Sequence, residues 1–403
     1  MRKKINKSLT KVFIALAGIL MLALIAALLA YPPVYVFRLI TWGNSDVFDW
    51  KKFPEHSLKA AQVAFTFNKA TNDRVSTLFG ELAGTDNWET FLEKNRTQAF
   101  IVIQDGTLLY EQYFNGTQRD SIVTSFSVAK SFTSALIGIA IDEGYIESVN
   151  DPITNYLPEL STRDVRFEKI TIRDLLRMSS GLEYKENRFP GLNGDDPLTT
   201  YYPDQRHLAL ENTKIIDFPG EYFLYNKYHP QLLGMIIERA TGGSVTEYLQ
   251  EKIWEAVGME FSGSWSIDSE ESGFEKMETG INARAIDFAK FGQLFLNRGA
   301  WNGLQVISQA WISESTNPYI PTDYSTYYPS DWFSDLPGQG YYQYMWWGIA
   351  KEHGSYDFVA AGDKGQFIYV SPDHALVIIR NGIDYGIPFA SWFELFYGFA
   401  SEF

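Results

Sequence analysis

The hydrophobic pattern opens with a long apolar stretch at positions 12–30 that contains no charged residue. A helix over these positions, rising 1.5 Å per residue, nearly spans a ~30 Å hydrocarbon core. Positions 1–11 carry basic residues and no acidic one (Arg2, Lys3, Lys4, Lys7 and Lys11). The positive-inside rule predicts a cytoplasmic tail over 1–11, a single transmembrane anchor over 12–30 in the cell membrane, and an extracytoplasmic remainder. A cleaved signal peptide is the alternative, although Leu28 is a poor minus-three residue for a cut after Ala30.

Residues 31–90 look like a connector between this anchor and the main domain. Pro32 and Pro33 end the anchor helix, because proline cannot continue it. The segment is too apolar for a free linker, so we expect it to pack on the body (Trp42, Phe48, Trp50 and Phe53). Asp46 and Asp49 lack further oxygen ligands nearby and are interpreted as turn caps rather than as a metal pair.

Residues 91–403 carry the patterns of one mixed domain. Residues 99–104 and 107–113 resemble two strands, joined by the strong hairpin turn Asp105-Gly106. Residues 125–144 are apolar on almost every side, as in a buried helix. Helical spacing then recurs, and strands return only near the end (helices at 171–178, 230–240, 245–256, 284–297 and 388–397; strands at 366–370 and 375–380). This order predicts an α/β (α+β) fold: an antiparallel sheet flanked by helices, with a helical subdomain over about 145–320.

Composition narrows the classes of function. The chain has 34 basic and 49 acidic residues, a net charge of −15, so we expect no nucleic-acid partner. It contains no cysteine, which excludes disulfides, Cys-ligated zinc and a thiol nucleophile. Its five histidines are scattered, and it has no His-Glu-x-x-His, phosphate-binding loop or Gly-x-Ser-x-Gly motif. We therefore expect neither a metal site nor a Ser-His-Asp triad.

Ser127 and Lys130 are the leading candidates for chemistry. Residues at i and i+3 share one helix face, so the hydroxyl and the amine lie within reach of each other. Burial in an apolar helix lowers the pKa of a lysine towards that of a useful base. The pattern Ser-x-x-Lys is weak alone, and Ser8 to Lys11 is a chance copy. In the alternative interpretation, Lys130 points to solvent and Ser127 merely caps the helix.

Further stretches in the same order resemble the serine β-lactamase-related superfamily, most nearly class C-like esterases and 6-aminohexanoate-dimer hydrolases. The resemblance covers about 90–400 and lies in six stretches (125–132, 175–182, 223–227, 232–242, 279–292 and 361–366). It implies a β-lactamase/transpeptidase-like fold, with the Ser-Lys helix between the sheet and the helical subdomain. It also implies that Ser127 is the nucleophile and Lys130 the base.

The family's second and third motifs are both altered. Tyr225 occupies the tyrosine of the Tyr-x-Asn motif, but Lys227 replaces the asparagine, either adding charge near Tyr225 or facing solvent. At the third motif, Lys-Thr-Gly or His-x-Gly in relatives, we match Asp363-Lys364-Gly365. The resemblance implies an oxyanion hole from the backbone N–H groups of Ser127 and Gln366. Gly365 either allows close backbone approach to a substrate or simply forms a tight turn.

These departures guide the expected function. We expect a serine hydrolase that cleaves a small ester or amide through an acyl-enzyme, with Ser127, Lys130 and Tyr225 catalytic and no cofactor. Lys227, Asp363, Gly365 and one tryptophan of the aromatic stretch 319–347, Trp346, are the expected substrate contacts. The alternatives are a peptidoglycan D,D-peptidase or β-lactamase, which Lys227 and Asp363 disfavour, and a membrane-tethered binding or sensor domain without catalysis.

Overall fold

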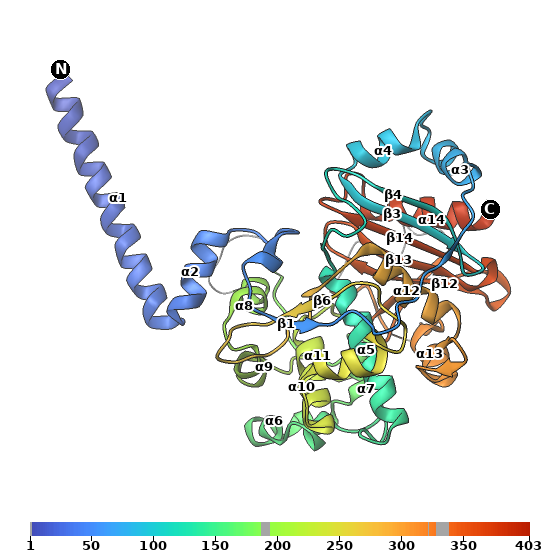
Figure 1. The fold of residues 1–403 in the computed structure, drawn as a ribbon. Coiled ribbons are helices and arrows are strands. Elements are labelled where there is room, and N and C mark those ends of the chain that lie inside the picture. Colours follow the sequence, from blue (N-terminus) through green and yellow to red (C-terminus); the bar gives the residue numbers. More distant parts are fainter. Residues whose placement is uncertain (1, 187–193, 321, 328–337) are drawn as a thin grey trace.

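A computed structural model describes residues 2–186, 194–320, 322–327 and 338–403 (Figure 1). Helix α1 (Arg2–Ala30) projects away from a body formed by the rest of the described chain. Its segment Thr10–Ala30 is long and apolar enough to cross a membrane, and only 6% of its most apolar window is buried.

The body is built on an eight-stranded sheet. The strand order is β10-β11-β12-β13-β14-β3-β4-β2, and neighbours are antiparallel except the short parallel pair β2–β4. The bounds of these strands, in sheet order, are Gln339–Gln343, Trp346–Ala350, Tyr356–Gly362, Gln366–Ser371, Leu376–Gly382, Thr97–Gln104, Thr107–Tyr113 and Asn68–Lys69. The β3–β4 hairpin turns at Asp105 and Gly106, both with positive φ (48° and 69°), as such a tight turn requires.

Helices cover both faces of this sheet. On one face α12 (Ala285–Leu296) packs so closely that a Cβ at Gly292 would meet the side chains of Ile368 and Val377. On the other face lie α3 (Arg74–Ala83), α4 (Trp88–Lys94) and α14 (Phe389–Glu402), joined by stacked rings such as Phe79 on Phe399 at 4.0 Å. The apolar helix α5 (Ala129–Asp142) packs against α12 through Phe132, which stacks on Phe291 at 3.6 Å. Helix α5 therefore lies between the sheet and the remaining helices.

The rest of the body is mainly helical and lies beyond α5 (Figure 1). A four-stranded sheet of order β1-β6-β7-β5 runs beside these helices, and β8 and β9 form a separate hairpin. The helices are α6 (Pro158–Arg163), α7 (Ile172–Leu176), α8 (Asp195–Tyr201), α9 (Gln205–Asn212), α10 (Tyr228–Thr241), α11 (Val245–Leu249) and α13 (Gln309–Thr316). The strands are β1 (Glu55–Leu58), β5 (Val123–Thr124), β6 (Gly263–Ser266), β7 (Ile281–Ala283), β8 (Ala300–Trp301) and β9 (Leu304–Gln305). Short helical turns lie at η1 (Asp49–Lys51), η3 (Ile153–Asn155), η4 (Val165–Lys169), the π-helical η5 (Gln250–Trp254), η6 (Glu352–Gly354) and η7 (Pro372–His374).

The connector between α1 and the domain is folded onto the body. Helix α2 (Pro33–Trp42) packs against α8, where the Arg38 guanidinium donates a hydrogen bond to the Tyr201 carbonyl at 3.1 Å. Strand β1 then pairs with β6, and β2 adds to the edge of the large sheet beside β4. The segment thus contributes strands to both sheets before α3 begins.

The predicted α+β fold, an antiparallel sheet flanked by helices with one N-terminal apolar helix, is confirmed by this architecture. The pattern did not show the short strands β5, β6 and β7, because two to four residues are too few for a periodicity to emerge. The pattern also predicted one helix over 125–144. In the structure Phe126–Val128 forms a separate 3₁₀ turn, η2, and α5 begins only at Ala129.

Candidate active site

Ser127 lies in η2, immediately before the buried helix α5. The turn places Phe126 at φ 42°, a region that bulky residues rarely adopt, so surrounding contacts must hold it there. Ser125 supplies several of them: its N–H donates to the Ile281 carbonyl at 2.8 Å, and its Oγ accepts from the Ile281 N–H at 3.1 Å. Strand β7 therefore fixes the turn that presents Ser127.

Lys130 points inward, one helical turn after Ser127. Its Nζ donates to Ser127 Oγ at 2.9 Å and to the Glu278 carbonyl at 2.7 Å, and the residue is only 1% exposed. Burial, and secondly the positive charge of Lys227, lower its pKa from 10.5 to about 7. This geometry excludes the alternative in which Lys130 points to solvent. Near neutral pH a large fraction of the amine is unprotonated and can accept a proton from Ser127.

Tyr225 completes a cluster around the serine hydroxyl. Its phenol hydrogen-bonds Ser127, and its ring centroid lies 5.1 Å from Lys130 Nζ. Burial raises the pKa of Tyr225 well above its usual value of 10, so the phenol keeps its proton at neutral pH. The neighbouring Asn226 holds the loop, because its Nδ2 donates to the Leu182 carbonyl at 3.2 Å. The cluster thus contains one neutral acid and one base with a lowered pKa.

Lys227 faces the pocket rather than bulk solvent. Its Nζ forms an ion pair with Asp196 Oδ1 at 2.6 Å, and the Tyr184 hydroxyl donates to the same oxygen at 2.7 Å. The charge of Lys227 acts on Lys130, whose pKa it lowers. This position therefore contributes to the electrostatics of the base, where the family motif has an uncharged asparagine.

The end of β12 presses directly on the nucleophile turn. A Cβ added at Gly362 would lie 3.0 Å from the Ser127 nitrogen and 2.5 Å from the Ser125 oxygen. Only glycine allows this approach, because any side chain would displace the η2 backbone. Gly362 is therefore the glycine that packs against Ser127. The sequence did not show this, because nothing in the local pattern distinguishes Gly362 from Gly365.

Gly365 has a structural reason to be glycine. It lies at φ 77° in the β12–β13 turn, and a Cβ there would overlap the guanidinium of the buried Arg380. Its carbonyl accepts from Arg380 Nη1 at 2.8 Å. Gly365 thus forms the tight turn, the space beside it is filled by Arg380, and it is not among the residues that line the pocket in front of Ser127.

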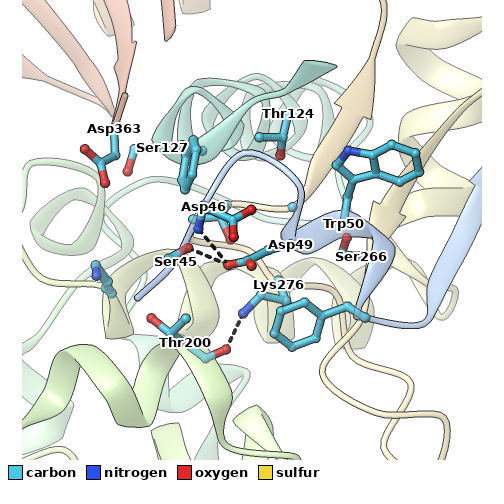
Figure 2. Close-up of a pocket in the computed structure, with 15 residues that line it drawn as sticks. Ser45, Asp46, Asp49, Trp50, Thr124, Ser127, Thr200, Ser266, Lys276 and Asp363 are labelled. Carbon is cyan, nitrogen blue, oxygen red and sulfur yellow. Dashed lines mark hydrogen bonds between the residues drawn. The ribbon is translucent and has the colours of Figure 1, made fainter. Parts of the chain in front are cut away.

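Gln366 and Asp363 occupy different positions in this hairpin. Gln366 lies opposite Gly362 in the β12–β13 ladder, and its buried Nε2 donates to the Gly382 carbonyl at 2.7 Å. Asp363 is exposed at the tip, where its Oδ1 accepts from the Lys364 N–H at 2.8 Å. Figure 2 shows Asp363 beside Ser127 at one end of the pocket. A carboxylate thus lies beside Ser127 in the lining of the pocket.

The two tryptophans of β11 point to opposite sides of the sheet, as successive strand residues do. Trp346 is fully buried in the core, with its centroid 4.5 Å from the ring of Phe295 and 5.2 Å from that of Phe358. Trp347 stacks on Tyr225 at 5.8 Å. The expectation that Trp346 contacts a substrate is therefore corrected, because its side chain lies in the core, and Trp347 is the tryptophan that contacts Tyr225. Residues 328–337 of the same aromatic stretch lie outside the described residues.

A cavity of about 100 Å³ opens in front of Ser127 (Figure 2). Lys227, Lys276 and Asp363 line it together with residues of the connector, a wall that we name the connector strap (Ser45, Asp46, Asp49, Trp50 and Phe53). The aromatic residues of the strap predicted packing on the body, but no sequence pattern predicted that they would line the pocket. The site is therefore assembled partly from the segment that follows α1.

The acids of the connector strap form a closed turn. Asp49 accepts from Ser45 Oγ at 2.8 Å and from the Asp46 N–H at 3.1 Å, and Lys52 Nζ pairs with Asp49 Oδ1 at 2.7 Å. This agrees with their interpretation as turn caps. Across the described residues, no group of three or more His, Asp or Glu side chains is arranged to hold a metal ion.

Comparison with known proteins identifies the family of this chain. The sequence model of the Beta-lactamase family matches residues 88–380. The chain belongs to the Beta-lactamase family. The superfamily resemblance inferred from the motifs is thereby confirmed, and the chain is a hydrolase of this family.

Individual relatives are distant in sequence, and the extent of the chain that they match differs from one to the next. The chain is 26% identical over 306 residues to a 6-aminohexanoate-dimer hydrolase from Paenarthrobacter ureafaciens, covering 72% of this chain and 74% of the relative. It is 31% identical over 135 residues to a D-aminopeptidase from Brucella anthropi, covering 33% of this chain and 24% of the relative. A solved structure from Bacillus anthracis, provisionally named a 6-aminohexanoate-dimer hydrolase, is 25% identical with a TM-score of 0.72 and covers 86% of this chain and 89% of its own. A class C β-lactamase shares the fold alone, at 16% identity with a TM-score of 0.59, covering 83% and 98%.

Proposed function

We propose that this chain hydrolyses a small ester or amide through a covalent acyl-enzyme formed on Ser127. The observation that carries the proposal is the 2.9 Å contact between Ser127 Oγ and Lys130 Nζ. Lys130 is buried, and its pKa of about 7 suits a general base at neutral pH. The intact nucleophile, base and tyrosine weigh against a non-catalytic binding or sensor domain.

The reaction proceeds in two stages. Ser127 Oγ attacks the carbonyl carbon while its proton moves to the neutral amine of Lys130. The Tyr225 phenol donates its proton to the leaving oxygen or nitrogen and recovers one from the Lys130 ammonium. A water molecule then attacks the acyl carbon and gives its proton to the Lys130–Tyr225 pair. The bond between Ser127 Oγ and the acyl group breaks, the acid leaves, and the pair passes the proton to Oγ. Lys130 and Tyr225 act as one coupled unit, so the observed titration belongs to the pair.

The oxyanion of the tetrahedral intermediate needs two backbone donors. One is the N–H of Ser127. We assign the other to the N–H of Asp363, in place of that of Gln366, because Asp363 follows Gly362, which packs against the Ser127 nitrogen. Gln366 instead lies opposite Gly362 within the hairpin ladder.

The charges around Ser127 favour an uncharged or cationic substrate group. Asp363 presents a carboxylate there, and two like charges ~4 Å apart at an effective dielectric near 20 repel by ~4 kcal/mol. The carboxylate of a penicillin would meet this repulsion. The positive charge of Lys227 does not cancel this repulsion, because its amine is already paired with Asp196. Similarity to a 6-aminohexanoate-dimer hydrolase and a D-aminopeptidase supports a small-molecule substrate.

The proposal is tested with Ser127→Ala and a fluorophosphonate probe. We expect this variant to fold, to lose hydrolysis of nitrophenyl butyrate and to escape labelling, while mass spectrometry places the label of the natural chain on Ser127. Ser8→Ala, at the chance Ser-x-x-Lys copy, is the matched control and should react normally. Retained hydrolysis by Ser127→Ala, or absence of label from the natural chain, would refute the assignment.

The peptidase or β-lactamase alternative is tested by comparing nitrophenyl butyrate with nitrocefin. We expect ester turnover with little or no nitrocefin turnover, because Asp363 repels the β-lactam carboxylate. Asp363→Asn should improve nitrocefin kcat/KM relative to the ester. Efficient nitrocefin hydrolysis by the natural sequence would make the alternative the better proposal.

We also propose that α1 is an uncleaved anchor that holds the catalytic domain outside the cell membrane. The apolar segment Thr10–Ala30 and the basic residues before it support this topology. Protease added to spheroplasts should digest the domain and spare the N-terminal tail. A protected domain would reverse the topology, and a mature N-terminus near residue 31 would indicate a cleaved signal peptide.

A further inference from the structure

Helix α2 has one face fixed to the catalytic domain. Tyr35 is fully buried, and its ring lies 5.9 Å from that of Tyr202, just after α8. The Arg38 guanidinium lies over the rings of Trp42 and Phe53, 5.1 Å from each centroid, and bonds to the Tyr201 carbonyl. These aromatic and hydrogen-bonded contacts make α2 a rigid part of the body.

The opposite face of α2 is apolar and exposed. Val34, Phe37 and Ile40 follow one another at intervals of three residues, and they are 47%, 58% and 66% exposed. Residues spaced by three or four lie on one side of a helix, so the three side chains form a continuous stripe. A helix face turned to water normally carries polar residues, and a contiguous apolar stripe indicates a partner.

The position of the stripe identifies its partner. Helix α1 ends at Ala30 and α2 begins at Pro33, so only Tyr31 and Pro32 separate the stripe from the apolar segment Thr10–Ala30. Ala30 and Pro33 are three residues apart, a distance of at most ~11 Å, so α2 starts close to the end of α1. If α1 spans the bilayer, as proposed above, α2 therefore starts at the lipid–water interface.

We propose that the stripe Val34, Phe37 and Ile40 of α2 lies in the outer surface of the lipid bilayer and docks the catalytic domain onto it. The inference rests on the proposed anchor. Apolar side chains buried in the headgroup and acyl boundary stabilise such interfacial helices. The partner surface is uncharged lipid, because the stripe offers no cation and the chain carries a net charge of −15.

Docking through α2 fixes the location of the active-site pocket. Helix α2 ends at Trp42, and the connector strap begins to line the pocket at Ser45. Three residues reach at most ~11 Å, so this wall of the pocket lies close to the end of the docked helix. The pocket is thereby held near the membrane surface, within reach of substrates that partition there.

The natural chain contains no cysteine, so single spin labels can be placed without background. We would attach a spin label to Phe37→Cys and to Ile40→Cys in the full chain, reconstituted in phosphatidylcholine vesicles. The accessibility of each label to oxygen, which concentrates in lipid, is then compared with its accessibility to a nickel chelate, which stays in water, from the relaxation enhancement that each reagent causes. Val63→Cys, on the body and 82% exposed, is the matched control in water. Leu22→Cys, within Thr10–Ala30, reports on the anchor itself. Each labelled protein must retain ester hydrolysis, which shows that it is folded.

We expect the ratio of oxygen to nickel accessibility at positions 37 and 40 to exceed that at position 63 by at least threefold. Equal ratios at 37, 40 and 63, with a lipid-like ratio at 22, would overturn the docking proposal and leave the anchor intact. A water-like ratio at 22 would refute the anchor, and the docking proposal with it. Shielding at 37 and 40 that disappears as the protein is diluted in lipid would assign the stripe to a second copy of the chain and also overturn the proposal.

Discussion

The charge of Lys227 should set the pH range in which the enzyme works. Burial and this neighbouring cation lower the pKa of Lys130 from 10.5 to about 7. At pH 7 about half of the Lys130 amines are then neutral, against roughly one in three thousand for an ordinary lysine. Replacing Lys227 by glutamine removes a like charge, so the pKa of Lys130 should rise.

The size of the shift follows from the same electrostatics. For an assumed separation of ~10 Å between the two charges and an effective dielectric near 20, Coulomb's law gives ~1.7 kcal/mol, about one pKa unit. For a shift of one unit, the neutral fraction of Lys130 at pH 7 falls from about one half to about one in eleven. We therefore expect kcat/KM for nitrophenyl butyrate in Lys227→Gln to fall about fivefold at pH 7 and to recover above pH 8.5.

The assay is the acid limb of kcat/KM against pH, which reports the free enzyme. Lys227→Arg keeps the positive charge and is the matched control, so its acid limb should stay near pH 7. Lys227→Gln also leaves Asp196 without its ion pair, and Asp196 raises the pKa of Lys130. The double variant with Asp196→Asn should therefore move the limb part of the way back. An unmoved or more acidic limb in Lys227→Gln would refute this account of the base.

Three further variants separate catalytic from structural roles. Trp346→Ala should destabilise the fold by ~3–5 kcal/mol in denaturant unfolding, whereas Trp347→Ala should mainly lower kcat/KM; the reverse pattern would contradict the corrected assignment. Lys130→Met should be inactive, and its gain in unfolding free energy over the natural chain should shrink as pH rises from 7 to 10.5. Over this range the folded amine is mostly neutral, and the cost of deprotonating it on folding falls as the unfolded amine approaches its own pKa. A gain that stays constant with pH would show that Lys130 is not desolvated. Gly362→Ala should reduce kcat strongly with little effect on secondary structure by circular dichroism, because its Cβ would push on the Ser127 backbone.

Sequence patterns predicted the parts of the fold that have a strong local signal. The β3–β4 hairpin and the buried helix were predictable, because Asp105-Gly106 and a run of apolar residues are strong local signals. The order of motifs also placed Ser127, Lys130 and Tyr225, which the structure brings into contact. Local spacing is sufficient for Ser127 and Lys130 because they occupy neighbouring turns of one helical segment.

Features that depend on which face a residue presents were not predictable in the same way. Trp346 and Trp347 are adjacent in sequence, and only the sheet decides which one meets Tyr225. Gly362 and Gly365 differ in whether the space beside them is filled by the turn that carries Ser127 or by Arg380 of strand β14. Such contacts are set by tertiary packing, which no local pattern records.

The connector strap changes how the N-terminal segment should be understood. A simple tether can be lengthened or exchanged without consequence for catalysis, since it only holds a domain in place. Here residues that follow α1 pack their rings on Arg38 and form one wall of the cavity in front of Ser127. The segment from α2 to β1 is therefore part of the candidate active site as well as a connector. Exchange of α1 alone would leave this wall in place, whereas exchange of the segment from α2 to β1 would change the residues that line the cavity in front of Ser127.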